Sequence, residues 1–457
     1  MARARFVGLD LGTTSAKLVV LSDDLEQVLS VSKQYPADAI DIVNCNGRHE
    51  QDARVIATTA LELLRQLPWT EEEITLCVTG QMHGVIAWSS DQPVTHVSTL
   101  VTWRDRDCAR ALERHDDRSD AWLCGTVCEW FVYLLQTGHV RECSLCDQSD
   151  HNDRGDHLVT MHVSMAQSWP AHVFAQNRGP KRPTVTVLPV SHTVRVSGMP
   201  KLRVLTPVGD ATAAAYVCIP WGTGGGEGLA WWGAILCIRQ AAQQYVGKQG
   251  VLTFGTSAQV TLLSHVEQDC RYMDRRSNVF GQREISVFAS MNGGSTLQHV
   301  VHLIDSFRQG GIDDAWNFLR ACLQAACDSE HKRCCTCHCS PQVSPERGEE
   351  TGHVSQVKFD AFPAESFTAQ TMILSYVEGV FRNIFALVPA SVLSSLDTLA
   401  LVGSIFGRIP ELKHLVSRVL HDYLGDDKHP IELQVLNIDA SSGAALLAHH
   451  MHSDSAS

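Results

Sequence analysis

The chain has 457 residues, 44% of them apolar and 19% charged, so it can bury a large core and is long enough for two or three domains. Its formal net charge of −13 argues against a protein that binds nucleic acid or an anionic membrane through overall charge. The 16 cysteines are scattered, and no apolar run has the length of a signal peptide or a membrane span. We therefore expect a cytoplasmic protein with reduced thiols, without a nucleic-acid or membrane partner.

The first predicted element is a hairpin of two apolar strands, and its turn carries Asp10, Gly12, Thr13, Thr14 and Ser15. Gly12 tolerates unusual backbone angles and lets a ligand approach the backbone closely. The turn offers hydroxyl and amide donors that suit phosphate oxygens, and Asp10 offers a carboxylate for hydrated Mg²⁺. The turn therefore suggests a phosphate and metal site, and the alternative is an ordinary hairpin with a Gly-Thr turn.

The next predicted elements continue an α/β pattern. Residues 52–67 carry apolar side chains at helical spacing, and residues 74–79 form a short buried strand that ends in Gly80. A loop, residues 80–84, follows this strand, and residues 100–103 form another short strand. Residues 125–135 are consistent with a buried helix. The first third of the chain thus alternates strands and helices around one core.

The middle of the chain contains an irregular segment followed by a repeat of the opening pattern. Asp210 stands directly before a predicted helix of small residues. Residues 217–249 show no clear period, so we interpret them as an insertion or linker. Residues 251–263 then repeat the order strand, Gly-Thr-Ser turn, strand. This repeat predicts two similar domains, each beginning with a Gly-Thr hairpin.

The last part of the chain predicts further α/β elements. Residues 365–388 form a long helix, and residues 398–402 form a buried strand that ends at Gly403 and Ser404. An amphipathic helix is expected around residues 412–420 and a strand at 431–436. A final helix begins after Asp439 and is rich in small residues, which permit close packing.

These motifs, in this order, resemble the FGGY carbohydrate kinases, and among them most closely the sedoheptulokinases. The matching segments are Gly8-Leu9-Asp10-Leu11-Gly12-Thr13-Thr14-Ser15, Gly80-Gln81-Met82-His83-Gly84, Thr102-Trp103 with Asp105, Gly209-Asp210, Gly255-Thr256-Ser257, Ser290-Met291-Asn292-Gly293-Gly294, and residues 439–446. The resemblance implies two actin/hexokinase-like (ribonuclease H-like) α/β domains with an intervening cleft. It places the N-terminal domain at residues 1–216, an irregular insertion at 217–249 and the C-terminal domain at 250–457.

The resemblance also implies an ATP-dependent phosphorylation of a sugar hydroxyl that uses Mg²⁺. It implies that Asp10 is the metal-associated carboxylate and that Asp210 is the catalytic general base. The positions that it assigns to the nucleotide are Thr13, Thr14, Ser15, Gly255, Thr256, Gly403 and Ser404. The positions that it assigns to the sugar are Gln81, Met82, His83, Trp103 and Asp105. We favour the conversion of sedoheptulose to sedoheptulose 7-phosphate.

Several alternatives remain at this point. The sugar could be xylulose or another ketose, and the chain could be a catalytically impaired sugar-binding relative. Compared with the family, a segment before Gly125 is shortened, and residues 217–249 interrupt the expected run between the two domains. Ile405 and Phe406 are bulky where close backbone approach to the purine is expected. Asp210 could instead serve only as a helix cap.

Overall fold

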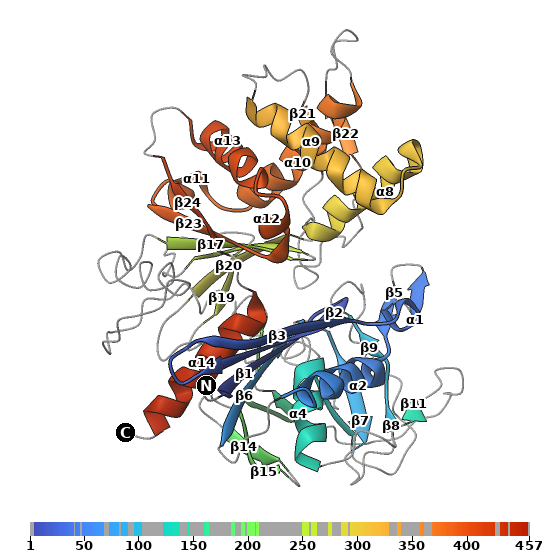
Figure 1. Ribbon diagram of the computed structural model, residues 1–457, viewed down its shortest axis with the longest axis vertical. Helices are drawn as coiled ribbons and strands as arrows, with labels where there is room; N and C mark the ends of the chain where they lie inside the picture. The colour runs from blue at the N-terminus through green and yellow to red at the C-terminus, as the bar shows by residue number, and fades with distance from the viewer. Residues whose placement is uncertain are drawn as a thin grey trace. The chain divides into compact units, whose positions relative to one another are not determined.

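The computed structural model describes two compact units, each with mixed strands and helices (Figure 1). The described residues are 4–40, 42–45, 48–67, 73–81, 84–89, 96–102, 122–137, 144–145, 160–163, 184–187, 193–196, 199–205, 207–209, 249–255, 257–262, 273–276, 285–290, 293–328, 336–339, 357–360, 368–425, 430–436 and 439–455. The predicted insertion at 217–249 falls outside them, apart from its last residue.

The first unit combines the N-terminal part of the chain with the final helix. Its strands are β1 (Ala4–Leu11), β2 (Ser15–Ser22), β3 (Gln27–Gln34), β4 (Val43–Cys45), β5 (Arg48–Gln51), β6 (Ile74–Gly80), β7 (Ile86–Ser89), β8 (His96–Val97), β9 (Leu100–Val101), β10 (Trp122–Gly125), β11 (Ser144–Leu145), β12 (Thr160–Val163), β13 (Thr184–Val187), β14 (Thr193–Val196), β15 (Met199–Leu205) and β16 (Val208–Gly209). Its helices are α1 (Ala37–Ile40), α2 (Ala53–Leu64), α4 (Val127–Thr137) and α14 (Ala440–Ser455).

The main sheet of this unit has the strand order β14-β15-β6-β1-β2-β3, and β16 also pairs with β6. β1 and β2 form the predicted antiparallel hairpin, and β6 runs parallel to β1. Helix α2 confirms the helix predicted within residues 52–67, and the Asp52 side chain caps it by accepting a hydrogen bond from the Arg54 backbone N–H at 2.9 Å. Its apolar face packs into the core of the unit because Ile56, Ala60 and Leu63 are buried.

Helix α14 packs against β1, β6 and β2, although more than 400 residues separate it from β1 in the sequence (Figure 1). The contact depends on small residues, since a Cβ atom added to Gly8 would lie 1.8 Å from the Ser441 carbonyl oxygen and 2.5 Å from the Ala445 nitrogen. The predicted boundaries assigned residues 250–457 to the second domain. This part of the division is wrong for α14, because its buried face completes the sheet of the first unit.

The second unit contains the remaining described elements. Its strands are β17 (Gln249–Phe254), β18 (Ala258–Leu262), β19 (Met273–Arg276), β20 (Ile285–Ser290), β21 (Thr336–Cys339), β22 (Val357–Asp360), β23 (Thr398–Val402) and β24 (Glu432–Leu436). Its helices are α8 (Gly294–Arg308), α9 (Ile312–Asp328), α10 (Ala369–Ala386), α11 (Ala390–Leu393), α12 (Ser404–Arg408) and α13 (Leu412–Leu424).

The sheet of the second unit repeats the local topology of the first. Its order is β19-β20-β18-β17-β23-β24, in which β17 and β18 form an antiparallel hairpin and β23 runs parallel to β17. The β17–β18 pair therefore corresponds to the β1–β2 pair, and β23 corresponds to β6. This correspondence confirms that the repeat read from residues 251–263 is a structural one.

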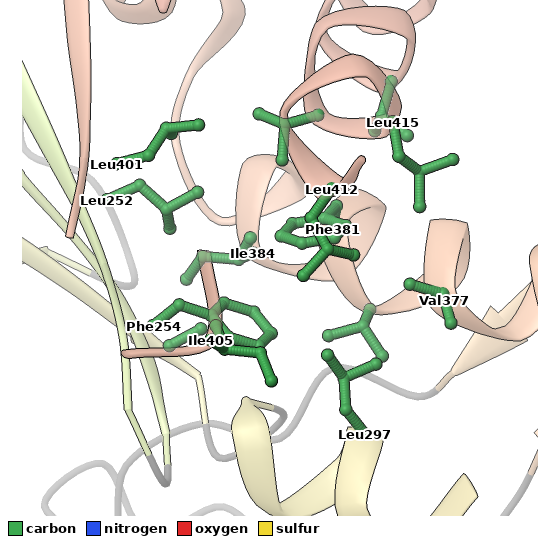
Figure 2. Close-up of a cluster of buried hydrophobic side chains, with 14 of the residues drawn as sticks. Leu252, Phe254, Leu297, Val377, Phe381, Ile384, Leu401, Ile405, Leu412 and Leu415 are labelled. Carbon is green, nitrogen blue, oxygen red and sulfur yellow. The ribbon is translucent and has the colours of Figure 1, made fainter. Parts of the chain in front are cut away.

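The core of the second unit forms where helices α10, α12 and α13 cover one side of this sheet (Figure 2). Phe254 from β17 lies 5.1 Å from Phe381 of α10 and 5.8 Å from Phe406 of α12, measured between ring centroids. Leucines and isoleucines surround the three rings, as Figure 2 shows for Leu252 and Ile384. Close packing of this kind fixes the end of β17, where the second predicted phosphate turn begins.

None of the helices in the described part of the chain is both long enough and apolar enough to cross a membrane.

Candidate active site

The first predicted phosphate turn joins β1 to β2. The Gly12 backbone N–H donates to the Ser15 carbonyl oxygen at 3.1 Å and closes the turn around Thr13 and Thr14. Thr14 is exposed, whereas Thr13, Ser15 and the preceding Asp10 are buried. The structure therefore brings these five predicted residues together at one end of the hairpin.

Two neighbouring segments hold the carbonyl groups of this turn. The Gln51 side chain donates from Nε2 to the Thr13 carbonyl oxygen at 2.9 Å, and the Tyr35 backbone N–H donates to the Thr14 carbonyl oxygen at 3.0 Å. Both donors come from ends of strands, since Gln51 is the last residue of β5 and Tyr35 follows β3. With its carbonyls engaged on the protein side, the turn has a defined backbone conformation for contact with a ligand.

Oxygen-bearing side chains surround Asp10, which is 7% exposed. Thr79 is its partner on parallel β6 and Lys17 its partner on β2, and paired residues share a face of the sheet. The hydroxyl groups of Thr79 and Tyr35 are buried and have no hydrogen-bond partner among the described residues. Burial, reinforced by the charges of Asp10 and Cys128, raises the pKa of Tyr35. Carboxylate and hydroxyl oxygens are ligands that a hard cation such as Mg²⁺ prefers, so this donor set fits the metal.

The predicted sugar loop begins directly beside the phosphate turn. The Gln81 backbone N–H donates to the Leu11 carbonyl oxygen at 3.0 Å, and a Cβ atom on Gly80 would lie 2.4 Å from that same oxygen. Glycine at position 80 therefore allows β6 to approach the end of β1 closely. Met82 and His83 lie outside the described residues.

The Gln81 side chain points into the protein. It is 2% exposed, and its Nε2 donates to Gln51 Oε1 at 2.9 Å and lies 3.5 Å from the Gly12 carbonyl oxygen. Its Oε1 has no hydrogen-bond partner among the described residues. The sequence predicts that the Gln81 side chain contacts the sugar. In the structure the amide nitrogen of Gln81 already binds protein atoms, and Oε1 is the atom of this side chain that has no partner among the described residues.

Three further predicted residues, Trp103, Asp105 and Asp210, lie outside the described part of the chain. The residue that leads into the first two is well anchored, because Thr102 donates from its backbone N–H and from Oγ1 to the His49 carbonyl oxygen at 2.9 and 3.1 Å. The strand end from which Trp103 and Asp105 follow is thus tied to β5.

The second predicted phosphate turn joins β17 to β18 and repeats the first. The Gly255 backbone N–H donates to the Ser257 carbonyl oxygen at 3.0 Å, as Gly12 does to Ser15. The Gly255 carbonyl oxygen in turn accepts from the Gly294 backbone N–H at the start of α8, at 2.6 Å. Thr256, the residue at the tip, lies outside the described part of the chain.

Gly403 occupies in the second unit the place of Gly80 in the first. It follows β23 with φ +130°, and a Cβ atom there would lie 2.3 Å from the Phe254 carbonyl oxygen. Ser404 is exposed at the start of α12, whereas Ile405 and Phe406 are buried. The two bulky residues therefore contribute to the core, as Figure 2 shows for Ile405. Ser404 is left exposed at the predicted adenosine position.

Sequence reasoning missed one residue that the structure places within the site. Gln51 is 1% exposed and contacts both the phosphate turn and the sugar loop. The sequence contains a pattern that could have indicated Gln51, because residues 48–51 form a run of four polar residues directly before a predicted amphipathic helix. A polar run that lies in a buried strand has specific hydrogen-bond partners.

Comparison with known proteins finds a family model that matches the N-terminal part of the chain. The model of the FGGY family of carbohydrate kinases, N-terminal domain, matches residues 5–121. Human sedoheptulokinase is 25% identical over 355 residues, which are 66% of this chain and 70% of that protein. Residues 5–121 belong to the FGGY family of carbohydrate kinases. The gluconokinase of Bacillus subtilis (strain 168) is 30% identical over 118 residues, covering 25% of this chain and 20% of that enzyme.

Solved structures of FGGY-type sugar kinases share the fold of the chain. Gluconate kinase from Lactobacillus acidophilus has a TM-score of 0.62 at 14% identity, and the matched region covers 99% of this chain and 90% of the chain of the gluconate kinase. Xylulose kinase from Rhodospirillum rubrum has a TM-score of 0.62 at 14% identity, with coverage of 99% and 91%. Glycerol kinase from Plasmodium falciparum, solved with ADP, has a TM-score of 0.60 at 11% identity, with coverage of 98% and 89%.

These structures confirm the predicted actin/hexokinase-like fold class with two α/β domains. The family match and the similarity to sedoheptulokinases together identify a sugar kinase enzyme.

Proposed function

We propose that the chain transfers the γ-phosphoryl group of ATP to a primary hydroxyl of a ketose, and that this ketose is sedoheptulose. Two relatives similar over about two thirds of the chain, the human and mouse proteins, are both sedoheptulokinases. The product would be sedoheptulose 7-phosphate. A cytoplasmic location belongs to the same proposal, and the buried thiols of Cys77 and Cys322, which form no disulfide, are consistent with a reducing compartment.

The observation that carries the proposal is the direct connection between the phosphate turn and the sugar loop. Gln81 donates from its backbone to Leu11, and its side chain reaches Gln51, which holds Thr13. A phosphoryl transfer requires the acceptor hydroxyl and the phosphate to be held in one fixed geometry. A shared hydrogen-bonded scaffold under both binding loops supplies that geometry.

On the nucleotide side, the two Gly-Thr turns would contact phosphate oxygens through backbone amide and hydroxyl groups. These residues are Thr13, Thr14 and Ser15 in the first unit and Gly255 and Thr256 in the second. Gly403 and Ser404 would receive adenosine, where a glycine backbone and an exposed Ser404 allow close approach. Asp10 would hold Mg²⁺, and the metal when bound would neutralise phosphate charge.

On the sugar side, Gln81, Met82, His83, Trp103 and Asp105 would orient the ketose. Asp210 would accept the proton of the attacking hydroxyl as its oxygen forms the new bond to the γ-phosphorus. The bond between the γ-phosphorus and the bridging oxygen breaks at the same time, and ADP leaves with that oxygen. In this scheme Asp210 holds the proton, the sugar oxygen carries the phosphoryl group and ADP keeps the bridging oxygen.

The test is ADP release measured in the presence of Mg²⁺ and a panel of sugars: sedoheptulose, xylulose, ribulose and glycerol. The proposal expects release that depends on sedoheptulose and is strongest with it. Faster release with xylulose or ribulose would replace sedoheptulose by that ketose. Binding of a sugar without ADP release would indicate a catalytically impaired relative.

The variant Asp210→Asn tests the assigned base. Replacing the carboxylate by an amide of the same size removes the proton acceptor, so turnover is expected to fall by about 10²–10⁴-fold. Sugar binding, measured by isothermal titration calorimetry, should be retained. Turnover close to that of the unmodified chain would exclude Asp210 as the base.

A further inference from the structure

The side chain of Gln51 links the two predicted binding loops through one amide group. Its Nε2 donates to the Thr13 carbonyl oxygen at 2.9 Å, and its Oε1 accepts from Gln81 Nε2 at 2.9 Å. We infer that Gln51 is a positioning residue that couples sugar binding at the Gln81 loop to phosphate binding at the Thr13 turn. This inference rests on the proposed function and adds to it a residue that neither the sequence motifs nor the relatives assign.

The chemistry of a primary amide fixes the direction of this link. One end of the Gln51 amide can only donate and the other can only accept, so the carbonyl oxygen of Thr13 determines which end faces Gln81. Because the amide is planar, a displacement of the Gln81 side chain rotates or shifts the donor that holds Thr13. The two loops are therefore connected by a short, rigid path of two hydrogen bonds.

Burial makes this path energetically significant. Gln51 is 1% exposed and Gln81 is 2% exposed, so water cannot replace either hydrogen bond. Breaking one bond leaves a buried donor or acceptor without a partner, which is unfavourable because its lost bond to water is not replaced. Arrangements of the two loops that keep both bonds are favoured accordingly.

The backbone of Gln51 is held firmly on both sides. Gln51 lies opposite Leu100 where β5 pairs with β9, and the next residue, Asp52, caps helix α2. The Asp52 backbone N–H also donates to the Ala39 carbonyl oxygen at 2.9 Å. Since β9 leads into the predicted sugar contacts Trp103 and Asp105, β5 is a common support for the sugar strand and the phosphate turn.

The consequence is mutual: a sugar that fixes the Gln81 loop also fixes the phosphate turn, so each ligand raises the affinity for the other by the same factor. A sugar bound at the loop that begins with Gln81 would act on the link by fixing the position of the Gln81 backbone, whose N–H donates to the Leu11 carbonyl oxygen at 3.0 Å. Without Gln51, the sugar and the nucleotide would still bind, but this mutual effect would weaken.

The experiment measures the Kd of a non-hydrolysable ATP analogue with Mg²⁺, in the absence and in the presence of a saturating sugar that supports ADP release. The ratio of the two Kd values is the coupling factor. The variants are Gln51→Met, which removes both hydrogen bonds, and Gln51→Glu, which keeps the acceptor for Gln81 and loses the donor to Thr13. Gln81→Met and the double variant with Gln51→Met complete a double-mutant cycle.

Ser22→Ala is the matched control. Ser22 is also fully buried, and its Oγ accepts a hydrogen bond from the Glu26 backbone N–H at 3.0 Å, but it lies at the opposite end of β2 from the phosphate turn. Thermal unfolding of every variant is recorded, and Gln51→Glu, a polar side chain of the same size, serves if Gln51→Met does not fold. Hydrogen exchange of the peptide that contains Thr13 provides a readout that does not depend on turnover.

The inference expects a coupling factor that falls at least about threefold in both Gln51 variants, which corresponds to about 0.65 kcal/mol, while it is unchanged in Ser22→Ala. In the cycle, the double variant should lose no more coupling than Gln51→Met alone, because both side chains belong to one path. Sugar should slow hydrogen exchange of the Thr13 peptide in the unmodified chain, and less so in the Gln51 variants.

Two outcomes overturn the inference, and they differ in what they say of the proposed function. An unmodified chain that is active, together with folded Gln51 variants whose coupling factor is unchanged, removes the coupling role and leaves the kinase proposal intact. If the unmodified chain does not release ADP with any sugar of the panel, and sugar has no effect on its nucleotide affinity, both the coupling role and the kinase proposal are removed. Equal losses in Ser22→Ala and Gln51→Met would show a general effect of destabilisation and would also remove the coupling role.

Discussion

Replacing Gly8 by alanine should detach the final helix from the first unit. The added Cβ atom would lie 1.8 Å from the Ser441 carbonyl oxygen and 2.5 Å from the Ala445 nitrogen, and both are backbone atoms that cannot rotate away. An ordinary carbon–oxygen contact is about 3.5 Å, so α14 must move by about 1.7 Å. The buried residues Ala444 and Leu447, which are fully excluded from solvent, would lose contacts with the sheet at the same time.

The expected cost is about 3 kcal/mol or more, because overpacking against backbone exceeds the usual range for a flexible core. For a unit of this size, such a loss lowers Tm by about 6–12 °C. Gly250→Ala in β17 is the matched control, since a Cβ atom there meets the ends of leucine side chains: Cδ1 of Leu396 at 3.0 Å, Cδ1 of Leu399 at 3.1 Å and Cδ2 of Leu262 at 3.5 Å. These side-chain ends can shift, so the control should cost less than about 1 kcal/mol.

Two measurements check this prediction: thermal unfolding followed by circular dichroism, and hydrogen exchange of the peptide that covers residues 440–455. Gly8→Ala should show a lower Tm and faster exchange of that peptide, whereas Gly250→Ala should show neither. If both variants unfold at the same temperature, with equal protection of α14, the close contact of this helix with β1 does not exist as described.

Two further predictions concern a strained glycine and a buried thiol. Gly403→Ala should destabilise the second unit through both backbone strain and a clash, because φ is +130° and the added Cβ would lie 2.3 Å from the Phe254 carbonyl oxygen. Gly425→Ala, with φ +84°, ψ 164° and open space around the added Cβ, carries only the backbone strain of about 1–3 kcal/mol, so Gly403→Ala should cost about 1–3 kcal/mol more. Equal urea-unfolding midpoints of the two variants would contradict this. Burial raises the pKa of Cys77, so the unfolded chain loses this proton first. The contribution of Cys77 to stability should therefore be constant below about pH 8.5 and fall by up to about 1.4 kcal/mol per pH unit above it. Cys77→Ala should make this alkaline decline shallower, and an unchanged slope in urea unfolding would exclude Cys77 as a source.

The sequence predicts those elements well whose apolar residues follow a regular period. The helix expected within residues 365–388 is α10, with a Thr368 cap whose Oγ1 accepts from the Thr371 backbone N–H at 3.1 Å, and the strand expected at 398–402 is β23. In both cases a local pattern is sufficient, because the element buries one apolar side against the nearest core. The hairpin repeat was predictable for the same reason.

The partner of the final helix was not predictable in this way. Its small residues indicate close packing, but nothing in a local pattern says which sheet they approach. The contact joins Gly8 to Ser441 and Ala445 and is a property of the three-dimensional arrangement. A boundary drawn at residue 250 by sequence order therefore assigned the helix to the wrong unit.

The candidate site was predicted in part. The turn at Thr13 and the loop at Gln81 were found from their motifs, and the structure brings them together. The direction of the Gln81 side chain and the role of Gln51 were not found, because both depend on how β5 and β6 lie beside the hairpin. The direction of a side chain at the end of a strand is set by the neighbouring strands. A comparison of sequence motifs does not show which strands are neighbours.

The position of α14 also bears on how the protein is made. During synthesis, the strands of the first unit leave the ribosome well before residues 440–455, so the sheet face covered by Leu447 and its neighbours stays open until those residues have been translated. The second unit, by contrast, has every described element in one continuous stretch of chain, from β17 to β24. The first unit therefore begins before the second unit in the chain but is completed after it, and its open apolar face is the surface that chaperones would need to protect in the nascent chain.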